Sequence, residues 1–462
     1  MVEKGLNYMP RPMIHNFTQG PILRHLLIFS IPLMGANLMQ MLYNMIDMVV
    51  IGQFVGKIGL SAVSIGGEVM NLATFIALGF STAGQVILSQ LIGAGRKEHI
   101  KETIQTMFVV LLSAAILLSG IGLLSIRQIL EVINTPAEAM ESALDYTRIC
   151  ISGLLFIYGY NLIGAVLRGL GDSKHPFLFI CIASLTNLVL DLVFVAAFKL
   201  GVAGAALATV IGQGVSFLCS FLLLYRRQNE FGLDIRLNSF RVDRDILCQL
   251  IHLGLPMSLQ SAAVSVSMMF VNSFINAYGV VASAATGAGF KLCTFISVVT
   301  QALASGGSTI VGQNLGAKKY ERVSVFFWSS LAINLCFAAL FSILTVLFPR
   351  KVFGIFTQEA EVLEMTMRFL PCAVIDYFGF AARSPTNALV NGSGHARLNL
   401  FMGIMDGIVS RIGLAVLLGI VLNLGILGFW YGSACSGLVP FMIGLIFFLS
   451  GKWKAENNRS GA

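Results

Sequence analysis

The chain has 462 residues, of which 56% are hydrophobic and only 11% are charged, and its mean hydropathy is +0.83. These values exclude a soluble globular protein and indicate an integral membrane protein built of helices. The net charge of +8 resides mainly in segments between apolar stretches, so we attribute it to membrane topology and not to nucleic-acid binding.

Twelve segments of the chain are predicted to be membrane-spanning helices, since about 20 mostly apolar residues cross the hydrocarbon core. In the first half they are 26–51, 62–92, 104–126, 141–168, 176–198 and 201–225. In the second half they are 247–277, 283–313, 326–348, 362–390, 398–422 and 426–449. This divides the chain into an N-lobe (1–225), a cytoplasmic linker (226–246), a C-lobe (247–451) and a cytoplasmic tail (452–462). Pro32 and Pro256 are expected in the first turns of their helices, where a missing N–H costs little.

Basic residues predict the orientation in the membrane. With the N-terminus inside, 20 Lys and Arg fall in cytoplasmic segments and five in external loops. Positive charge is retained on the cytoplasmic side, so we expect a multi-pass cell-membrane protein with both termini cytoplasmic and lipid around it.

The chain repeats itself at an offset of 223 residues. SQLIGAGRK at 89–97 recurs as GQNLGAKK at 312–319, and LRGLGD at 167–172 recurs as VNGSGH at 390–395. Six helices in each half make both halves enter from the same side. We therefore predict two six-helix lobes related by a pseudo-two-fold axis along the membrane normal, which is typical of a secondary transporter.

The chain carries no pattern that indicates an enzyme or a cofactor. Its glycine-rich motifs do not follow strands, so we interpret them as helix ends with glycine caps and not as nucleotide loops. The eight cysteines lack paired spacing and are interpreted as buried hydrophobic residues. No nucleophile–base or metal-ligand cluster is evident.

Five acidic residues lie well inside predicted helices, where each costs roughly 2.5–3.5 kcal/mol on insertion scales. They are Asp47, Glu68, Asp191, Asp376 and Asp406. An acidic residue at that depth is expected to be functional or paired.

Two polar stripes contain the acids of the first half. Helical spacing places Asn37, Gln40, Asn44 and Asp47 on one face of the first helix, and Ser184, Asn187 and Asp191 on one face of the fifth. Thr209 lies near the middle of the sixth. Two carboxylates with an amide and hydroxyls suit either a proton site or an oxygen cage for a hard cation, including Na⁺ at Asp47, Asn187 and Asp191. The alternative is that each stripe only satisfies hydrogen bonds of its neighbours.

Three of these stretches resemble the multidrug and toxic compound extrusion (MATE) family: MIDMVVIG at 45–52, NLVLD at 187–191 and GVAGAALAT at 201–209. The resemblance extends over nearly the whole chain. It implies that Asp47, Asn187, Asp191 and Thr209 match a cation site in the N-lobe that couples H⁺ or Na⁺ entry to export. It also implies a V-shaped pair of lobes and a broad preference for amphipathic, often cationic compounds.

The second half lacks the acids of the first. Aligned on the two prolines, Asp47 falls on Val271 and Asp191 on Ala415, so coupling is expected in the N-lobe. The polar stripes of helices 1 and 7 are expected to line the substrate cavity, through Asn37, Gln40, Asn44, Ser261, Ser265 and Asn272. In the C-lobe, Asp376, Arg383, Asp406 and Arg411 are expected to neutralise one another as a structural network. A role of these four in substrate or ion handling is the alternative.

Glu68 and Lys291 occupy one position of the repeat with opposite charges. Equivalent positions meet across a central two-fold axis, so we hypothesise an ion pair that helps to close the outer gate when the protein is open inward. The alternative is that each side chain extends separately to the outer interface.

The sequence therefore predicts a secondary active transporter, functional as a monomer, that exports amphipathic or cationic molecules by H⁺ or Na⁺ antiport without ATP. The rival prediction is a lipid-linked oligosaccharide or lipid flippase of the same wider superfamily, and a channel is a weaker rival.

Overall fold

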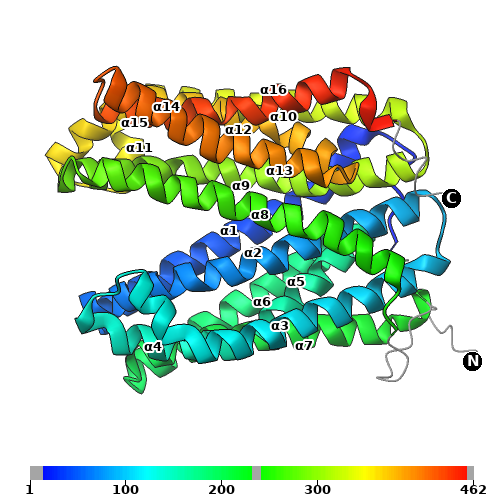
Figure 1. Ribbon diagram of the computed structural model, residues 1–462, viewed down its shortest axis with the longest axis horizontal. Helices are drawn as coiled ribbons and strands as arrows, with labels where there is room; N and C mark the ends of the chain where they lie inside the picture. Colours follow the sequence, from blue (N-terminus) through cyan, green and yellow to red (C-terminus); the bar gives the residue numbers. More distant parts are fainter. Residues whose placement is uncertain (1–13, 232–240, 455–462) are drawn as a thin grey trace, which may run out of the picture.

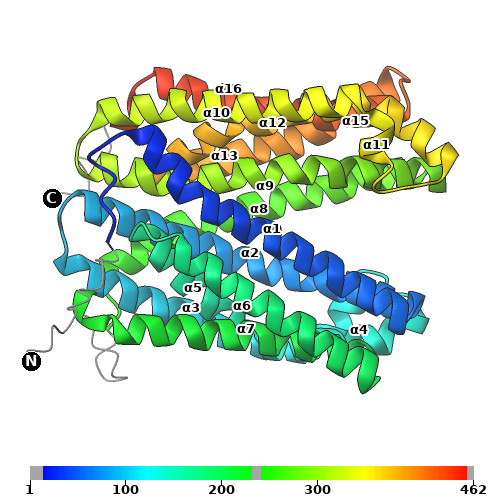
Figure 2. The same ribbon diagram turned by 180° about the vertical axis from the view of Figure 1, so that it is seen from behind.

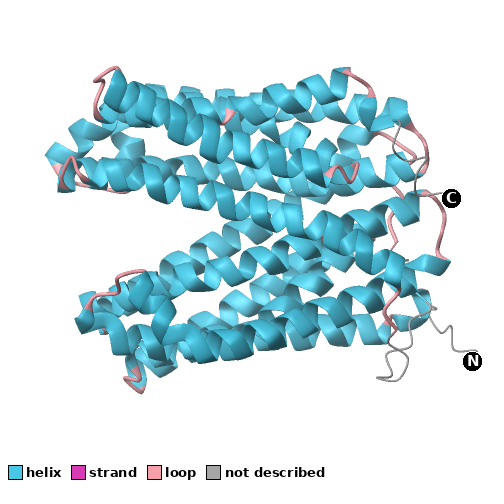
Figure 3. Ribbon diagram, viewed as in Figure 1, coloured by secondary structure: helices cyan, strands magenta, loops and turns pink. Residues whose placement is uncertain are grey.

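The computed structural model describes residues 14–231 and 241–454, and these residues form helices joined by loops, with no strand among them (Figure 3). The helices form two bundles that lie side by side (Figure 1). Many large apolar side chains in both bundles are exposed. Backbone hydrogen bonds satisfied within helices and an apolar exterior are what a bilayer requires. The predicted all-α, two-lobed fold is confirmed.

The N-lobe contains α1 to α7. Its elements are α1 (Ile22–Phe54), α2 (Lys57–Gly93), α3 (Glu98–Val132), α4 (Ala137–Ser152), α5 (Leu154–Gly169), α6 (Lys174–Asp191) continued by η1 (Leu192–Ala197), and α7 (Gly201–Arg226), followed by η2 (Gln228–Phe231). The helices α4 and α5 form one span with a bend of 48°. The predicted fourth helix, 141–168, corresponds to this bent pair.

The C-lobe contains α8 to α16. Its elements are α8 (Arg244–Asn276), α9 (Val280–Gly316), α10 (Tyr320–Leu347), α11 (Pro349–Phe353), α12 (Ala360–Gly392), α13 (Ala396–Ile404), η4 (Met405–Ile412), α14 (Gly413–Val416), η5 (Leu417–Val421), α15 (Ile426–Ser436), α16 (Leu438–Leu449) and η6 (Lys452–Lys454). Of the predicted linker, residues 232–240 lie outside the described residues, as do 455–462 of the predicted tail.

Ten spans of the described chain are long and apolar enough to cross a membrane, and the bent pair α4 and α5 makes eleven. The helix α12 takes the place of the predicted span 362–390 and packs against α9, α10 and α16. It is not one of these apolar spans, and five charged residues lower its mean hydropathy. These are Glu361, Glu364, Arg368, Asp376 and Arg383.

The first helix of each lobe begins in the core of the other lobe (Figure 2). From α1, the side chains up to Leu33 pack in a C-lobe core with residues of α9 and α10. From α8, the side chains up to Met257 pack in the N-lobe core. Pro32 and Pro256 lie beside these last shared residues, inside the helices. Our prediction that they occupy first turns was wrong, because α1 begins ten residues before Pro32 and α8 begins twelve residues before Pro256.

The lobes meet at one end and diverge toward the other (Figures 1 and 2). At the end where they meet, Gln90 Nε2 of α2 donates to the Gly392 carbonyl at 2.9 Å. Its repeat partner Gln313 donates to the His15 carbonyl at 3.0 Å, so both glutamines of the repeated motif bond to a carbonyl at this end, although the repeat does not relate the two acceptors. We call this the closed end, and the end with the α1–α2 and α8–α9 turns the open end. The first and last described residues both lie at the closed end.

Candidate functional site

Two buried carboxyl groups face each other in the N-lobe. Asp47 on α1 is 7% exposed and Asp191, the last residue of α6, is 0% exposed. They are close enough to share a hydrogen bond when one of them carries a proton. Asp47 Oδ1 and both oxygens of Asp191 receive no hydrogen bond from the described residues. Buried carboxylate oxygens without donors are costly, so the pair calls for a proton or a bound cation.

The helix that carries Asp191 changes its winding at this residue. The α-helix α6 ends there and continues as η1, a π-helical segment. Such segments are rare and occur often at functional sites, because the extra residue re-aims the neighbouring side chains. Asn187, which is 2% exposed, lies one turn before Asp191 on the same face of α6. Since α6 packs against α1, this face meets the polar stripe of α1.

One hydroxyl joins the three helices around the acids. Thr209 Oγ1 of α7 accepts a hydrogen bond from Tyr43 Oη of α1 at 3.2 Å and another from Asn187 Nδ2 of α6 at 3.4 Å. Both distances exceed the usual lengths for their bond types, so both bonds are weak. The Tyr43 ring also lies near enough to Asp47 and Asp191 to interact with them electrostatically.

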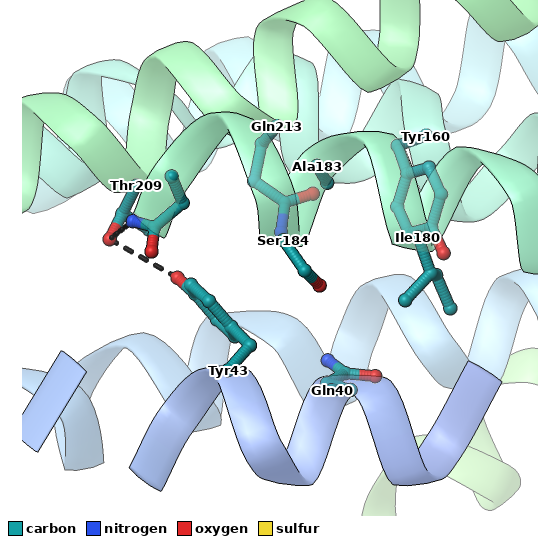
Figure 4. A pocket seen from close by; sticks show the side chains of 9 residues that line it. Gln40, Tyr43, Tyr160, Ile180, Ala183, Ser184, Thr209 and Gln213 are labelled. Atoms are coloured by element: carbon teal, nitrogen blue, oxygen red, sulfur yellow. Dashed lines mark hydrogen bonds between the residues drawn. The ribbon is translucent and has the colours of Figure 1, made fainter. Parts of the chain in front are cut away.

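A pocket with a free volume of about 350 Å³ lies beside this junction (Figure 4). This volume includes space that is open to solvent, and only a small part of it is enclosed by the side chains. It is lined by Gln40, Tyr43, Tyr160, Ile180, Ala183, Ser184, Asn187, Thr209 and Gln213. Asp47 and Asp191 do not line it. Tyr43, Asn187 and Thr209 therefore form the wall between the pocket and the acid pair.

The structure brings the four predicted coupling residues together around Thr209 and the acid pair. The predicted cavity residues are dispersed. Gln40 lines the pocket, Asn37 Nδ2 donates to the Val298 carbonyl of α9 at 3.5 Å, and Asn44 is exposed on α1. Ser261, Ser265 and Asn272 lie on α8 in the other lobe and do not line this pocket.

Glu68 and Lys291 lie on α2 and α9 toward the open end, and both are exposed. Neither forms an ion pair within the described part of the chain. The hypothesis places their ion pair in an inward-open arrangement, whereas the lobes here diverge at the end where both residues lie. The pairing stays a prediction.

The C-lobe holds a compact ion-pair network in place of an acid pair. Asp406 accepts from Arg383 Nη1 at 3.2 Å and from Arg411 Nη2 at 3.1 Å. Asp376 has a contact with Cys293 Sγ at 3.8 Å but no ion pair among the described residues. The ion pairs therefore join three of the four predicted members, and Asp376 stands outside them. Like Asp191, Asp406 is associated with a π-helical segment, η4.

The MatE family model matches residues 32–193 and 256–429 of the chain, which is more than half of its length. The chain belongs to the MATE family. The two matches begin at Pro32 and Pro256, the aligned prolines of the repeat, so the family unit occurs once in each half. MATE proteins are multidrug efflux transporters and not enzymes.

Similar MATE proteins match this chain over almost their entire length. The probable multidrug resistance protein YpnP of Bacillus subtilis (strain 168) is 27% identical over 442 residues, which cover 96% of this chain and 98% of the relative. The probable multidrug resistance protein NorM of Thermotoga maritima is 23% identical over 455 residues, which cover 97% and 96%.

Solved structures support the MATE fold. A MOP superfamily transporter from Pyrococcus furiosus Vc1 (DSM3638) superposes with a TM-score of 0.89 at 23% identity, covering 96% of this chain and 98% of that one. A multidrug resistance MATE family transporter in an outward-facing conformation also gives a TM-score of 0.89 at 23% identity, with the same coverage. At this identity the likeness concerns the fold alone.

Sequence reasoning on this MATE chain missed five pocket residues, of which Tyr43, Tyr160 and Gln213 are polar. Tyr43 lies one turn before Asp47 and three residues after Gln40, so it continues the polar stripe of α1. Gln213 follows Thr209 by one turn of α7 and shares its face. Tyr43 and Gln213 could therefore have been predicted from their helical spacing to the coupling residues. Tyr160 has no such signal, because its helix α5 carries no stripe that points to the acids.

Proposed function

We propose that this chain is a secondary active transporter that exports amphipathic or cationic compounds by H⁺ or Na⁺ antiport through alternating access. The observation that carries the proposal is the buried pair Asp47 and Asp191, which lies behind the wall of a polar pocket. Three of its four oxygens receive no hydrogen bond from the described residues. The names of its relatives, which describe multidrug resistance proteins, support the substrate class.

The acid pair supplies the coupling. Two nearby carboxylates repel each other, and a proton on one of them or a Na⁺ ion between them removes the repulsion. Asp47, Asn187, Asp191 and Thr209 are the residues that we assign to the ion. Because Asp47 and the pocket residue Gln40 share α1, relief of the repulsion lets this helix shift and displace a bound compound.

The pocket suits a cationic, partly aromatic compound. Tyr43 and Tyr160 offer aromatic faces to a cation, and the acid pair behind the wall adds long-range attraction. We extend the substrate path from the pocket along Asn37 and Asn44 and across to the polar stripe of α8. That stripe consists of Ser261, Ser265 and Asn272.

One ion per cycle provides enough free energy. A proton that moves down ~100 mV and ~1 pH unit releases roughly 3.7 kcal/mol. At ~1.4 kcal/mol per tenfold, this supports a gradient of about 500-fold for an uncharged compound at full coupling.

We place the closed end on the cytoplasmic side of the cell membrane, as the excess of basic residues predicts. With this orientation, the transporter in our proposal is open to the outside. One chain contains both lobes and the complete acid site, so we propose a functional monomer with lipid around its exposed apolar surface. The division into N-lobe, linker, C-lobe and tail follows the sequence boundaries given above.

The test is transport by the purified chain in liposomes, with ethidium as the compound and either a pH or a Na⁺ gradient alone. We expect one gradient to drive ethidium transport. Asp47→Asn and Asp191→Asn should reduce this transport at least tenfold, whereas Asp145→Asn, which changes an exposed acid of α4, should leave it intact. Absence of transport under both gradients, or wild-type transport by both site variants, would overturn the proposal.

A further inference from the structure

The Thr209 hydroxyl is the point where the pocket and the acid pair meet. A threonine hydroxyl offers two lone pairs as acceptors and one proton as a donor. In this structure both lone pairs are taken, one by Tyr43 Oη and one by Asn187 Nδ2. A cation that uses this oxygen as a ligand must therefore displace one of the two donors.

Tyr43 is the donor that has room to leave. Asn187 is 2% exposed and packs against Gly212 of α7. A methyl group added at Gly212 would lie 3.2 Å from the Cβ of Asn187, so this side chain has little room to move. Tyr43 is only partly buried and lines the pocket, so its ring borders free space. Its bond of 3.2 Å to Thr209 is long for two hydroxyls and is cheap to break.

A second acceptor for the Tyr43 hydroxyl lies on the face of α7 that carries Thr209. Gln213 Oε1 is buried and has no hydrogen-bond partner among the described residues. Gln213 lies four residues after Thr209, which is about 6 Å along α7, and both side chains line the pocket opposite Tyr43 (Figure 4). A phenol that moved from Thr209 to Gln213 would enter the space that a bound compound needs.

We propose that Tyr43 is the residue that couples ion binding to substrate release: Na⁺ ligation by Thr209 transfers the Tyr43 hydroxyl to Gln213, and the ring then displaces the compound. This inference rests on the proposed function and selects Na⁺ from its two ions. A proton on Asp47 or Asp191 needs no lone pair of Thr209, whereas Na⁺ takes oxygen ligands such as carboxylates and hydroxyls.

The experiment measures ²²Na⁺ binding and ethidium binding on the purified chain in detergent, with choline chloride replacing NaCl. In the wild type, saturating Na⁺ should weaken ethidium binding about tenfold. In Tyr43→Phe the competitor for Thr209 is lost, so Na⁺ should bind two- to tenfold tighter, roughly the worth of one hydrogen bond. Ethidium binding should then no longer respond to Na⁺.

Two further variants separate the steps. Gln213→Leu should keep the affinity for Na⁺ within about threefold of wild type. Ethidium binding should no longer respond to Na⁺, because the displaced Tyr43 hydroxyl has lost its second acceptor. Thr209→Ser should retain both effects, whereas Thr209→Val should lose both. Tyr225→Phe, which changes an exposed tyrosine at the other end of α7, is the matched control and should behave as wild type.

The inference is overturned if Tyr43→Phe binds Na⁺ with wild-type affinity and still releases ethidium on Na⁺ addition. It is also overturned if Tyr160→Phe, which removes another hydroxyl from the pocket wall, abolishes the Na⁺ effect equally. If Tyr43→Phe does not yield folded protein, the contrast between Gln213→Leu and Thr209→Ser decides. A wild type that transports on a pH gradient but binds no ²²Na⁺ contradicts this inference alone, whereas absence of transport under both gradients contradicts the proposed function.

Discussion

Gln85 of α2 donates a hydrogen bond to Thr309 Oγ1 of α9 at 3.0 Å and thereby joins the two lobes at the closed end. The same amide nitrogen donates to the Ser305 carbonyl at 3.1 Å, and the amide oxygen accepts from Arg168 Nε at 2.9 Å. Gln85 is 2% exposed. One buried amide therefore connects α2, α5 and α9, and it has to be released when the closed end opens.

Gln85→Leu should weaken the closed end. The exchange keeps the side-chain volume but removes three hydrogen bonds and leaves Arg168 Nε without its partner, which favours separation of the lobes by about 1–3 kcal/mol. Spin labels at the exposed positions Lys97 and Lys318 should report longer distances, or a second distance population. Gln128→Leu, an exposed glutamine of α3, is the control. Unchanged distances in Gln85→Leu would show that this amide does not hold the lobes.

Gly93 is predicted to be intolerant of any side chain. A Cβ there would lie 1.9 Å from the Gln313 carbonyl oxygen, and one at its repeat partner Gly316 would lie 2.1 Å from the Gln90 carbonyl oxygen. Neither backbone contact can yield, so Gly93→Ala should force the lobes apart at the closed end and abolish transport. Gly67→Ala on the same helix meets no atom within 4 Å and is the matched control. Wild-type transport by Gly93→Ala would contradict the close approach.

The two motif glycines show what a sequence reveals and what it hides. The prediction of a glycine-capped helix end holds for Gly95, whose φ of +73° is a conformation that glycine adopts freely. The role of Gly93 depends on a second helix more than 200 residues away, and no local pattern reports such a contact.

At the acid pair, too, the sequence predicts the arrangement within one helix but not the contacts between helices. Helical spacing alone places Asn187 and Asp191 on one face, because residues four apart lie above one another. The hydrogen bond between the Tyr43 and Thr209 hydroxyls could not be predicted from the sequence, because it depends on how α1 crosses α7. An aromatic residue in an apolar helix also carries no signal of its own, because most such residues pack in cores or face lipid.

The C-lobe acids should differ in their effect on stability. Asp406→Asn leaves the buried guanidinium group of Arg411 and the partly buried one of Arg383 without their anion, which should cost about 3–5 kcal/mol. Asp376→Asn breaks no ion pair, so its melting temperature in detergent should stay close to that of the wild type. Equal destabilisation by both variants would contradict the network. Reduced transport by a stable Asp376→Asn would instead assign this acid to substrate or ion handling.

Glu68 and Lys291 provide a test of the arrangement in which the lobes meet at the end that is open in this structure. Both are exposed toward the open end, so charge reversal of either should leave this structure stable. If they pair when the open end closes, Glu68→Lys and Lys291→Glu should each place like charges together and reduce transport about fivefold, since exposed pairs are worth up to about 1 kcal/mol. The double swap should restore transport, and high salt should diminish all three effects. Lys57→Glu, an exposed lysine at the start of α2 whose repeat position is Val280, is the control. A double swap as impaired as the single variants would remove the ion pair from the gating step.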